Sequence, residues 1–172
     1  MIELIIGGAR SGKSALAEER ARESGWPVIY IATAEAGDHE MAQRIAHHQR
    51  QRPAGWRVIE EALCLAKVLK QQAAAQHFIL VDCLTLWLTN LLCRDEANNS
   101  ALLETETAAL LEILPNLPGR IVLVSNEVGS GIVPLGAINR VFVDEQGRLN
   151  QRLARIADRV TLVAAGLPLE LK

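Results

Sequence analysis

The stretch Gly7-Gly8-Ala9-Arg10-Ser11-Gly12-Lys13-Ser14 decides the fold of this chain. It consists of a glycine, four further residues and Gly-Lys-Ser, and it lies between the apolar run 4–6 and the helix-forming run 15–20. A strand, a glycine-rich loop and a helix in this order are the context of a phosphate-binding P-loop. A glycine turn that binds nothing is the alternative, but such a turn needs neither the Lys-Ser pair nor this spacing. The motif therefore predicts a nucleotide site.

The residue types of this loop suit a phosphate chain. Glycines at 7, 8 and 12 allow positive φ, so successive backbone N–H groups can point at one phosphate chain. The helix that begins near Lys13 adds its positive N-terminal end. Lys13 is expected to lie against the β- and γ-phosphates, and the Ser14 hydroxyl to hold Mg²⁺. All eight residues are predicted nucleotide contacts: Gly7, Gly8, Ala9, Arg10, Ser11, Gly12, Lys13 and Ser14.

Length and composition restrict the class of protein. A chain of 172 residues is expected to form one domain with a core large enough to fold without disulfides. Its three cysteines show no Cys-x-x-Cys spacing and lie in apolar contexts, so we expect buried thiols rather than metal ligands. A net charge of −2 argues against nucleic acid as a partner. No signal-like or membrane-spanning run is present, which favours a soluble, cytoplasmic protein.

Short β-branched runs alternate with longer helical patterns along the chain. This alternation predicts one α/β domain over 1–172, with a mostly parallel central sheet flanked by helices. Strands are predicted at 4–6, 28–32, 56–60, 78–82, 121–124, 160–164 and 168–171, and helices at 13–24, 38–52, 63–74, 84–92, 101–114 and 146–157.

Polar residues follow several of these strands. In parallel sheets ligands collect at the C-terminal strand ends, so these residues outline a site. Asp82 ends a buried strand and is the second candidate for Mg²⁺, although it could also act as the N-cap of the next helix. The residues in question are Thr33, Glu60, Glu61, Asp82, Asn126 and Glu127.

Two further features leave alternatives open. Asn126 and Glu127 could orient a nucleophile or cap a turn. The glycines at 129, 131 and 136 could form a flap over the site or an ordinary loop.

The segment 41–53 contains two adjacent histidines, His47 and His48. On a helix His48 shares a face with Met41 and Ile45, which by itself favours a hydrogen-bonded core histidine over a catalyst. A neutral imidazole can, however, attack phosphorus, and nearby arginines can offset the charge that develops. Periodicity does not decide between the two readings.

Five blocks of sequence, taken together, resemble the bifunctional adenosylcobinamide kinase/adenosylcobinamide-phosphate guanylyltransferase family. Each block other than the P-loop is weak alone, but their order is specific. They are the P-loop, Tyr30-Ile31-Ala32-Thr33-Ala34, the segment from Arg44-Ile45 through His47-His48 to Arg52-Pro53, the segment from Asn126-Glu127-Val128-Gly129 to Gly131-Ile132-Val133-Pro134, and Asn150-Gln151 with Ala157-Asp158.

The resemblance implies a RecA-like P-loop NTPase fold and two reactions of cobalamin biosynthesis. The family phosphorylates the aminopropanol hydroxyl of adenosylcobinamide with ATP or GTP, then transfers GMP from GTP to that phosphate through a GMP–histidine intermediate. Alignment places that histidine at His48 rather than His47, and Lys13 as the second catalytic residue. Gln49 stands where many relatives carry a basic residue. The nucleotide contacts that the resemblance adds are Ala32, Thr33, Ala34, Gln49, Arg50, Gln51, Arg52, Glu60 and Asp82.

The resemblance also implies partners. The substrate is a corrinoid, and family members form homo-oligomers, with a trimer favoured; the corrinoid is expected near a subunit boundary. Two other readings are compatible with the P-loop alone. One is a kinase for another small alcohol or acid, with His48 structural, and the other is a nucleotide-dependent switch that controls a protein partner.

Overall fold

The computed structural model describes residues 1–35, 55–94 and 99–172. Its strands are β1 (Ile2–Gly7), β2 (Val28–Ala32), β3 (Arg57–Glu60), β4 (Phe78–Asp82), β5 (Arg120–Asn126), β6 (Arg159–Ala164) and β7 (Leu167–Glu170). Its helices are α1 (Lys13–Glu23), α3 (Leu65–Gln72), α4 (Leu84–Cys93), α5 (Asn99–Ile113) and α6 (Ala137–Ile156), with a 3₁₀ turn η1 (Leu114–Asn116) before β5.

One seven-stranded sheet has the order β3-β2-β4-β5-β1-β6-β7. Every pairing is parallel except the β6–β7 hairpin, so the prediction of a mostly parallel sheet is confirmed. The register aligns Glu60 with Ala32, Ala32 with Asp82, and Asn126 with Gly7. The polar strand ends therefore lie along the edge of the sheet that the C-terminal ends of the parallel strands form, as the sequence predicts.

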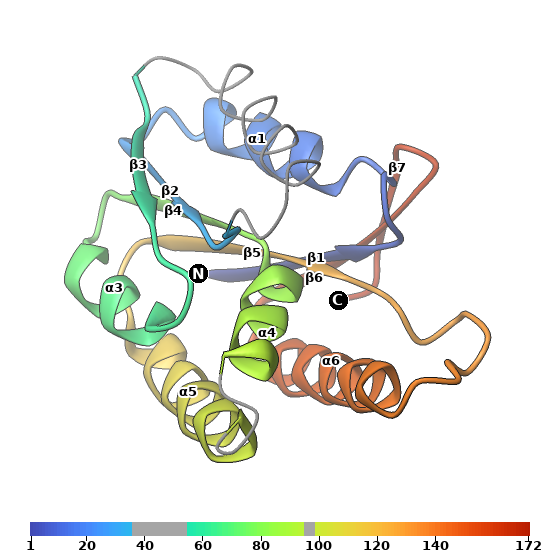
Figure 1. Cartoon of the computed structure of the whole chain (residues 1–172). Helices are drawn as coiled ribbons and strands as arrows, with labels where there is room; N and C mark the ends of the chain where they lie inside the picture. Colours follow the sequence, from blue (N-terminus) through green and yellow to red (C-terminus); the bar gives the residue numbers. More distant parts are fainter. Residues whose placement is uncertain (36–54, 95–98) are drawn as a thin grey trace.

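Alternating strand residues cover the two faces of the sheet. Helices α3, α4, α5 and α6 pack on one face, and α1 lies on the other (Figure 1). On the α1 side, Ala17 and Ala21 contact a cluster that includes Ile5, Tyr30 and Leu80. Small side chains on α1 allow the helix to approach the strands closely, and this sets the position of the P-loop at its N-terminus.

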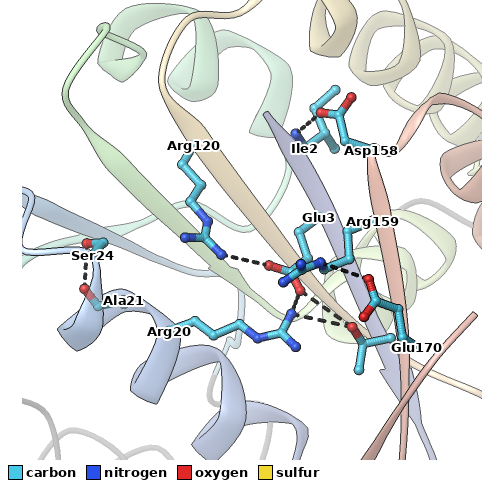
Figure 2. Close-up of polar contacts among 10 residues, drawn as sticks. Ile2, Glu3, Arg20, Ala21, Ser24, Arg120, Asp158, Arg159 and Glu170 are labelled. Atoms are coloured by element: carbon cyan, nitrogen blue, oxygen red, sulfur yellow. Dashed lines mark hydrogen bonds and ion pairs between the residues drawn. The ribbon is translucent and has the colours of Figure 1, made fainter. Parts of the chain in front are cut away.

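A buried ion cluster also fixes α1 to the sheet (Figure 2). The Glu3 side chain on β1 is fully buried, and its carboxylate pairs with Arg20 of α1 and with Arg120 of β5, the latter at 3.3 Å. The guanidinium of Arg120 also lies 5.3 Å from the centre of the Phe78 ring. Because a buried carboxylate requires opposite charges, this cluster determines where α1 crosses the sheet.

The element boundaries confirm most of the sequence predictions, and one helix start is wrong. We expected the last helix at 146–157, but α6 begins at Ala137, one residue after Gly136. The first turns of α6 expose the apolar side chains of Ile138 and Val141. These turns therefore lack the pattern of one apolar and one polar face from which a surface helix is predicted. The predicted helix 38–52 lies outside the described residues.

The expectation of buried thiols is wrong for two of the three cysteines. Cys64, which precedes α3, and Cys93, at the end of α4, are exposed, whereas Cys83 is half-buried. Both exposed thiols lie at helix ends, where an apolar neighbourhood in sequence does not ensure burial. None of the helices in the described ranges is long and apolar enough to cross a membrane.

Candidate active site

The loop between β1 and α1 has the geometry of a phosphate cradle. Gly12 is the N-cap residue of α1 and has φ 101°, in the left-handed region that glycine tolerates best. Gly7 is required by packing, because a Cβ there would lie 2.3 Å from the carbonyl oxygen of Val163. Both positions therefore need glycine, as the motif predicts.

The N-terminus of α1 is open to an anion. No side chain caps it, and its first turn contains no acidic residue. A cavity of about 340 Å³ adjoins it, lined by residues 10–15 and Glu18. Uncapped amides and the positive end of the helix dipole together form an anion site of the kind that binds phosphate.

Lys13 lies within this cradle. Its side chain is buried, and Nζ donates a hydrogen bond of 2.6 Å to the carbonyl oxygen of Gly8. Burial lowers the pKa of the Lys13 ammonium, while Cys83 and Asp82 act in the opposite direction. A phosphate chain beside Lys13 would stabilise its charged form and replace the carbonyl of Gly8 as its partner.

Asp82 ends β4 on the side of the sheet that α1 covers. Its Oδ2 accepts a hydrogen bond of 2.9 Å from the hydroxyl of Tyr30. The alternative that Asp82 caps α4 is wrong, because Cys83 is the N-cap residue and that cap has no side-chain hydrogen bond. Its carboxylate is thus held at the sheet edge, within electrostatic reach of Lys13.

The donor set fits Mg²⁺. Ser14 and Asp82 supply a hydroxyl and a carboxylate, which are hard oxygen ligands. Within the described ranges, no group of three or more His, Cys, Asp or Glu residues could hold a metal ion. Mg²⁺ at P-loops needs no such cage, since it uses one or two protein ligands together with water and substrate phosphates.

The loops after β2 and β3 are held by internal hydrogen bonds. The Thr33 hydroxyl donates to the carbonyl oxygen of Cys83 at 2.7 Å and also accepts from the Cys83 amide at 2.9 Å. Nδ2 of Asn90 contacts the carbonyl oxygens of Thr33 and Ala62. The fully buried Thr33 side chain thus fixes the loop, and a contact with nucleotide there would have to come from the neighbouring backbone.

The two acidic residues at the end of β3 differ. Oε1 of Glu61 accepts hydrogen bonds from the amides of Leu63 and Cys64 just before α3, so Glu61 caps a turn. Glu60 is exposed at the same sheet edge. Because β3 is the outermost strand and three strands separate it from β1, Glu60 lies far from the P-loop along the C-terminal ends of the strands.

The end of β5 contacts the P-loop strand directly. The amide of Glu127 donates to the carbonyl oxygen of Gly7 at 3.0 Å, and Glu127 Oε1 accepts from the amide of Gly129 at 2.7 Å. The turn-capping alternative is therefore correct for Glu127. Asn150 of α6 donates to the carbonyl oxygen of Asn126 at 2.9 Å, which gives one motif residue a role in fixing this strand end.

Three residues of the site were not predicted from the sequence. Gly166, in the β6–β7 turn, donates its amide to the carbonyl oxygen of Ser11 at 2.9 Å and thereby supports the P-loop. Asn90, which is partly exposed, and Tyr30, which is buried, make the hydrogen bonds described above. A polar residue inside an apolar run was the available signal for Tyr30 and Asn90, whereas nothing in the sequence linked Gly166 to the loop.

Six predicted site residues lie outside the described ranges. They are His47, His48, Gln49, Arg50, Gln51 and Arg52.

Comparison with known sequences matches residues 3–171 to the family described as cobinamide kinase / cobinamide phosphate guanyltransferase. The chain belongs to this family. One curated relative, the bifunctional adenosylcobalamin biosynthesis protein CobP of Pseudomonas aeruginosa, is 58% identical over 172 residues, covering all of this chain and 98% of the relative. The bifunctional adenosylcobalamin biosynthesis protein CobU of Salmonella typhimurium is 41% identical, and the alignment covers both chains completely. The chain is accordingly a bifunctional cobinamide kinase and guanylyltransferase of adenosylcobalamin biosynthesis, as the sequence resemblance implies.

Solved structures support the fold of this kinase/guanylyltransferase. The RadB recombinase aligns with a TM-score of 0.53 at 15% identity, over 94% of this chain and 73% of its own. A Pyrococcus horikoshii OT3 protein, PH0250, aligns with a TM-score of 0.55 at 12% identity, over 99% and 85%. At such low identity the likeness concerns the fold alone, and it confirms the RecA-like P-loop architecture.

Proposed function

We propose that the single P-loop site carries both reactions, with one nucleotide cradle used at two phosphorus atoms. The observation that carries the proposal is the uncapped N-terminus of α1 with Lys13 and Asp82 beside it, in a chain that belongs to this two-activity family. Two separate sites would each need a phosphate-binding loop with a lysine and a carboxylate beside it.

In the kinase reaction, the aminopropanol hydroxyl of adenosylcobinamide attacks the γ-phosphorus of ATP or GTP. A new P–O bond forms while the bond to the β-phosphate oxygen breaks, and the hydroxyl proton is released. Lys13 leaves the carbonyl of Gly8 and follows the charge that moves onto the leaving phosphate, and the amides at the start of α1 hold the remaining oxygens. Positioning and charge neutralisation supply most of the rate.

In the guanylyl transfer, His48 attacks the α-phosphorus of GTP and pyrophosphate leaves. The phosphate of adenosylcobinamide phosphate then attacks the same phosphorus, the P–N bond breaks and adenosylcobinamide-GDP is released. The division replaces one encounter between two bulky anions with two easier steps. His48 as the covalent residue rests on the sequence resemblance, since it lies outside the described ranges.

Ser14 and Asp82 are the proposed holders of Mg²⁺, Ser14 through its hydroxyl and Asp82 through the ion's water shell. Bound there, Mg²⁺ would neutralise the charge that develops on the phosphates. The remaining proposed nucleotide contacts are the other P-loop residues with Ala32, Thr33, Ala34, Gln49, Arg50, Gln51, Arg52 and Glu60. We further propose that residues 1–172 form one domain and that the enzyme works in the cytoplasm.

The chain is proposed to act as a homo-oligomer, with a trimer favoured. A run of apolar side chains in the loop after β5 and the start of α6 supports this proposal, because such patches mark association surfaces. Ile132 and Leu135 are 97% and 98% exposed, and Val133, Ile138 and Val141 are exposed beside them. The corrinoid is expected near this boundary.

Product analysis separates the roles of Lys13 and His48. With adenosylcobinamide, ATP and GTP as substrates, Lys13→Met should lose both products, by about 10²-fold or more in rate. His48→Ala should accumulate adenosylcobinamide phosphate and form no adenosylcobinamide-GDP. His77→Ala is the matched histidine control, since His77 precedes β4 at the opposite edge of the sheet. Formation of adenosylcobinamide-GDP by His48→Ala at the wild-type rate would refute the covalent route.

A further inference from the structure

Tyr30 is a buried aromatic residue whose polar end reaches the proposed metal site. It is 2% exposed, lies in the α1-facing cluster and stacks on Trp56, with ring centres 6.4 Å apart. Its hydroxyl donates the 2.9 Å hydrogen bond to Oδ2 of Asp82. Phenylalanine would fill the same space, so the hydroxyl is the part of this side chain that packing does not explain.

The geometry gives that hydroxyl a defined effect on Asp82. The terminal torsion of a carboxylate is broad, so an unrestrained Asp82 would sample many orientations. A hydrogen bond to Oδ2 fixes the carboxylate plane, and a bond to a charged acceptor from a buried donor is among the stronger kinds. Among the described residues Oδ1 has no hydrogen-bond partner, so this oxygen can face a hydrated ion.

A competing arrangement shows why the orientation matters. Lys13 and Asp82 interact electrostatically in the absence of nucleotide. A carboxylate free to turn could form a direct ion pair with the ammonium, and that pair would remove both groups from the phosphates. Tyr30 favours the orientation in which the two charges stay apart and each can act on the nucleotide.

We propose that Tyr30 is a positioning residue that orients the Asp82 carboxylate for the Mg²⁺–nucleotide complex. The inference rests on the proposed role of Asp82 at Mg²⁺. Tyr30 is proposed to touch neither substrate nor metal and to act through its hydrogen bond to Asp82 across the β2–β4 pair.

The test is the factor by which MgCl₂ strengthens nucleotide binding. The full chain is titrated calorimetrically with GMPCPP, whose methylene link blocks attack at the α-phosphorus, in EDTA and in saturating MgCl₂. Tyr30→Phe should bind GMPCPP in EDTA as tightly as the wild type does. The factor by which MgCl₂ raises its affinity should be about tenfold smaller than in the wild type, equivalent to about 1.4 kcal/mol. Asp82→Asn should show this reduction too, and the double variant should show no larger a reduction than Asp82→Asn alone.

Thr107→Val is the matched control, because it removes a buried hydroxyl that, among the described residues, bonds only within α5. A second readout uses the fact that Tyr30 is the one tyrosine of the chain. Incorporated 3-fluorotyrosine keeps the hydroxyl and gives one ¹⁹F resonance, which should shift when MgCl₂ is added to the GMPCPP complex, and should not shift in Asp82→Asn.

The outcomes distinguish the role of Tyr30 from the proposed role of Asp82 at Mg²⁺. Loss of the Mg²⁺ effect in Asp82→Asn but not in Tyr30→Phe would overturn the role of Tyr30 and leave that of Asp82 intact. No loss in either variant would overturn both. Equal weakening of Tyr30→Phe in EDTA and in MgCl₂ would also overturn the inference, because it would indicate a purely structural role.

Discussion

At the scale of single residues, burial sets the chemistry of the groups around the P-loop. Lys13 is buried and Cys83 half-buried, and desolvation disfavours the charged form of each. It lowers the pKa of the Lys13 ammonium, so the free enzyme holds this charge less firmly than an exposed lysine would. The nucleotide supplies the counter-charge, which makes phosphate binding and lysine ionisation favour each other.

Cys83 should be the least reactive of the three thiols. Burial raises its pKa from about 9 to about 11, so at pH 8 its thiolate population is roughly a hundredfold below that of an ordinary thiol. Peptide mapping after a short iodoacetamide pulse should find Cys93 and Cys64 modified and Cys83 unmodified. The folded protein keeps the proton of Cys83 up to a higher pH than the unfolded chain does. The free energy of unfolding should therefore fall as pH rises from about 9 to 11. Cys83→Ala should flatten that fall, and early alkylation of Cys83 would contradict the account.

The P-loop residues could be predicted from the sequence because their spacing encodes a backbone shape, whereas Tyr30 could not. Its run, Val28-Ile29-Tyr30-Ile31-Ala32, indicates a buried strand and nothing about the direction of the hydroxyl. Only the register of β2 on β4 brings that hydroxyl to Asp82. Glu3 is similar, since a charge within an apolar strand indicates a buried partner without identifying Arg20 and Arg120.

At the scale of elements, β1 is held by close backbone contact with β6, and α1 is held to the sheet by the buried charge of Glu3. Both features lead to predictions. The strand positions and the P-loop turn could be predicted in outline, because apolar runs mark buried parallel strands. The start of α6 could not, because its first turns face outward with apolar side chains. Gly166 supports the P-loop because β6 pairs with β1. This pairing cannot be predicted from the sequence around either residue.

Two neighbouring glycines of the P-loop should differ in their tolerance of a methyl group. In Gly7→Ala the Cβ would meet the backbone carbonyl of Val163, so stability should fall by about 2 kcal/mol. In Gly8→Ala the Cβ would have no neighbour within 4 Å, and stability should change by less than about 0.5 kcal/mol. Thermal unfolding without nucleotide measures both. Equal losses would show that the contact with β6 is not what requires glycine at 7.

The Glu3 cluster should contribute strongly to stability. In Glu3→Gln two partly buried guanidinium groups, of Arg20 and Arg120, lose their counter-charge, so unfolding in urea should show a loss of about 3 kcal/mol. Glu170→Gln is the matched control, because its pair with Arg159 is exposed and should contribute less than about 1 kcal/mol. A loss from Glu3→Gln no larger than that of the control would contradict the anchoring role.

At the scale of the whole molecule, the parallel sheet brings loops from distant parts of the sequence to one edge. The ends of β1, β2, β4 and β5 meet there, and the P-loop lies between the sheet and α1. Beyond this edge, the exposed apolar loop after β5 predicts a contact between copies of the chain.

The oligomer should depend on that loop. Leu135→Asp adds a charge to a fully exposed apolar position and should convert the oligomer to monomers at micromolar concentration, as measured by light scattering after gel filtration. Ser130→Asp adds the same charge to an exposed position of the same loop and should leave the oligomer intact. A wild-type monomer, or an unchanged oligomer in Leu135→Asp, would contradict the assignment of this surface.

The most direct test of the central claim is the intact mass of the enzyme after incubation with GTP and Mg²⁺, compared among the wild type, His47→Ala and His48→Ala. The account predicts an acid-labile gain of one GMP on the wild type and His47→Ala, and no gain on His48→Ala, because a phosphoramidate at His48 is the proposed intermediate. A folded, GTP-binding wild type that gains no GMP, or a His48→Ala variant that still gains it, would contradict the account.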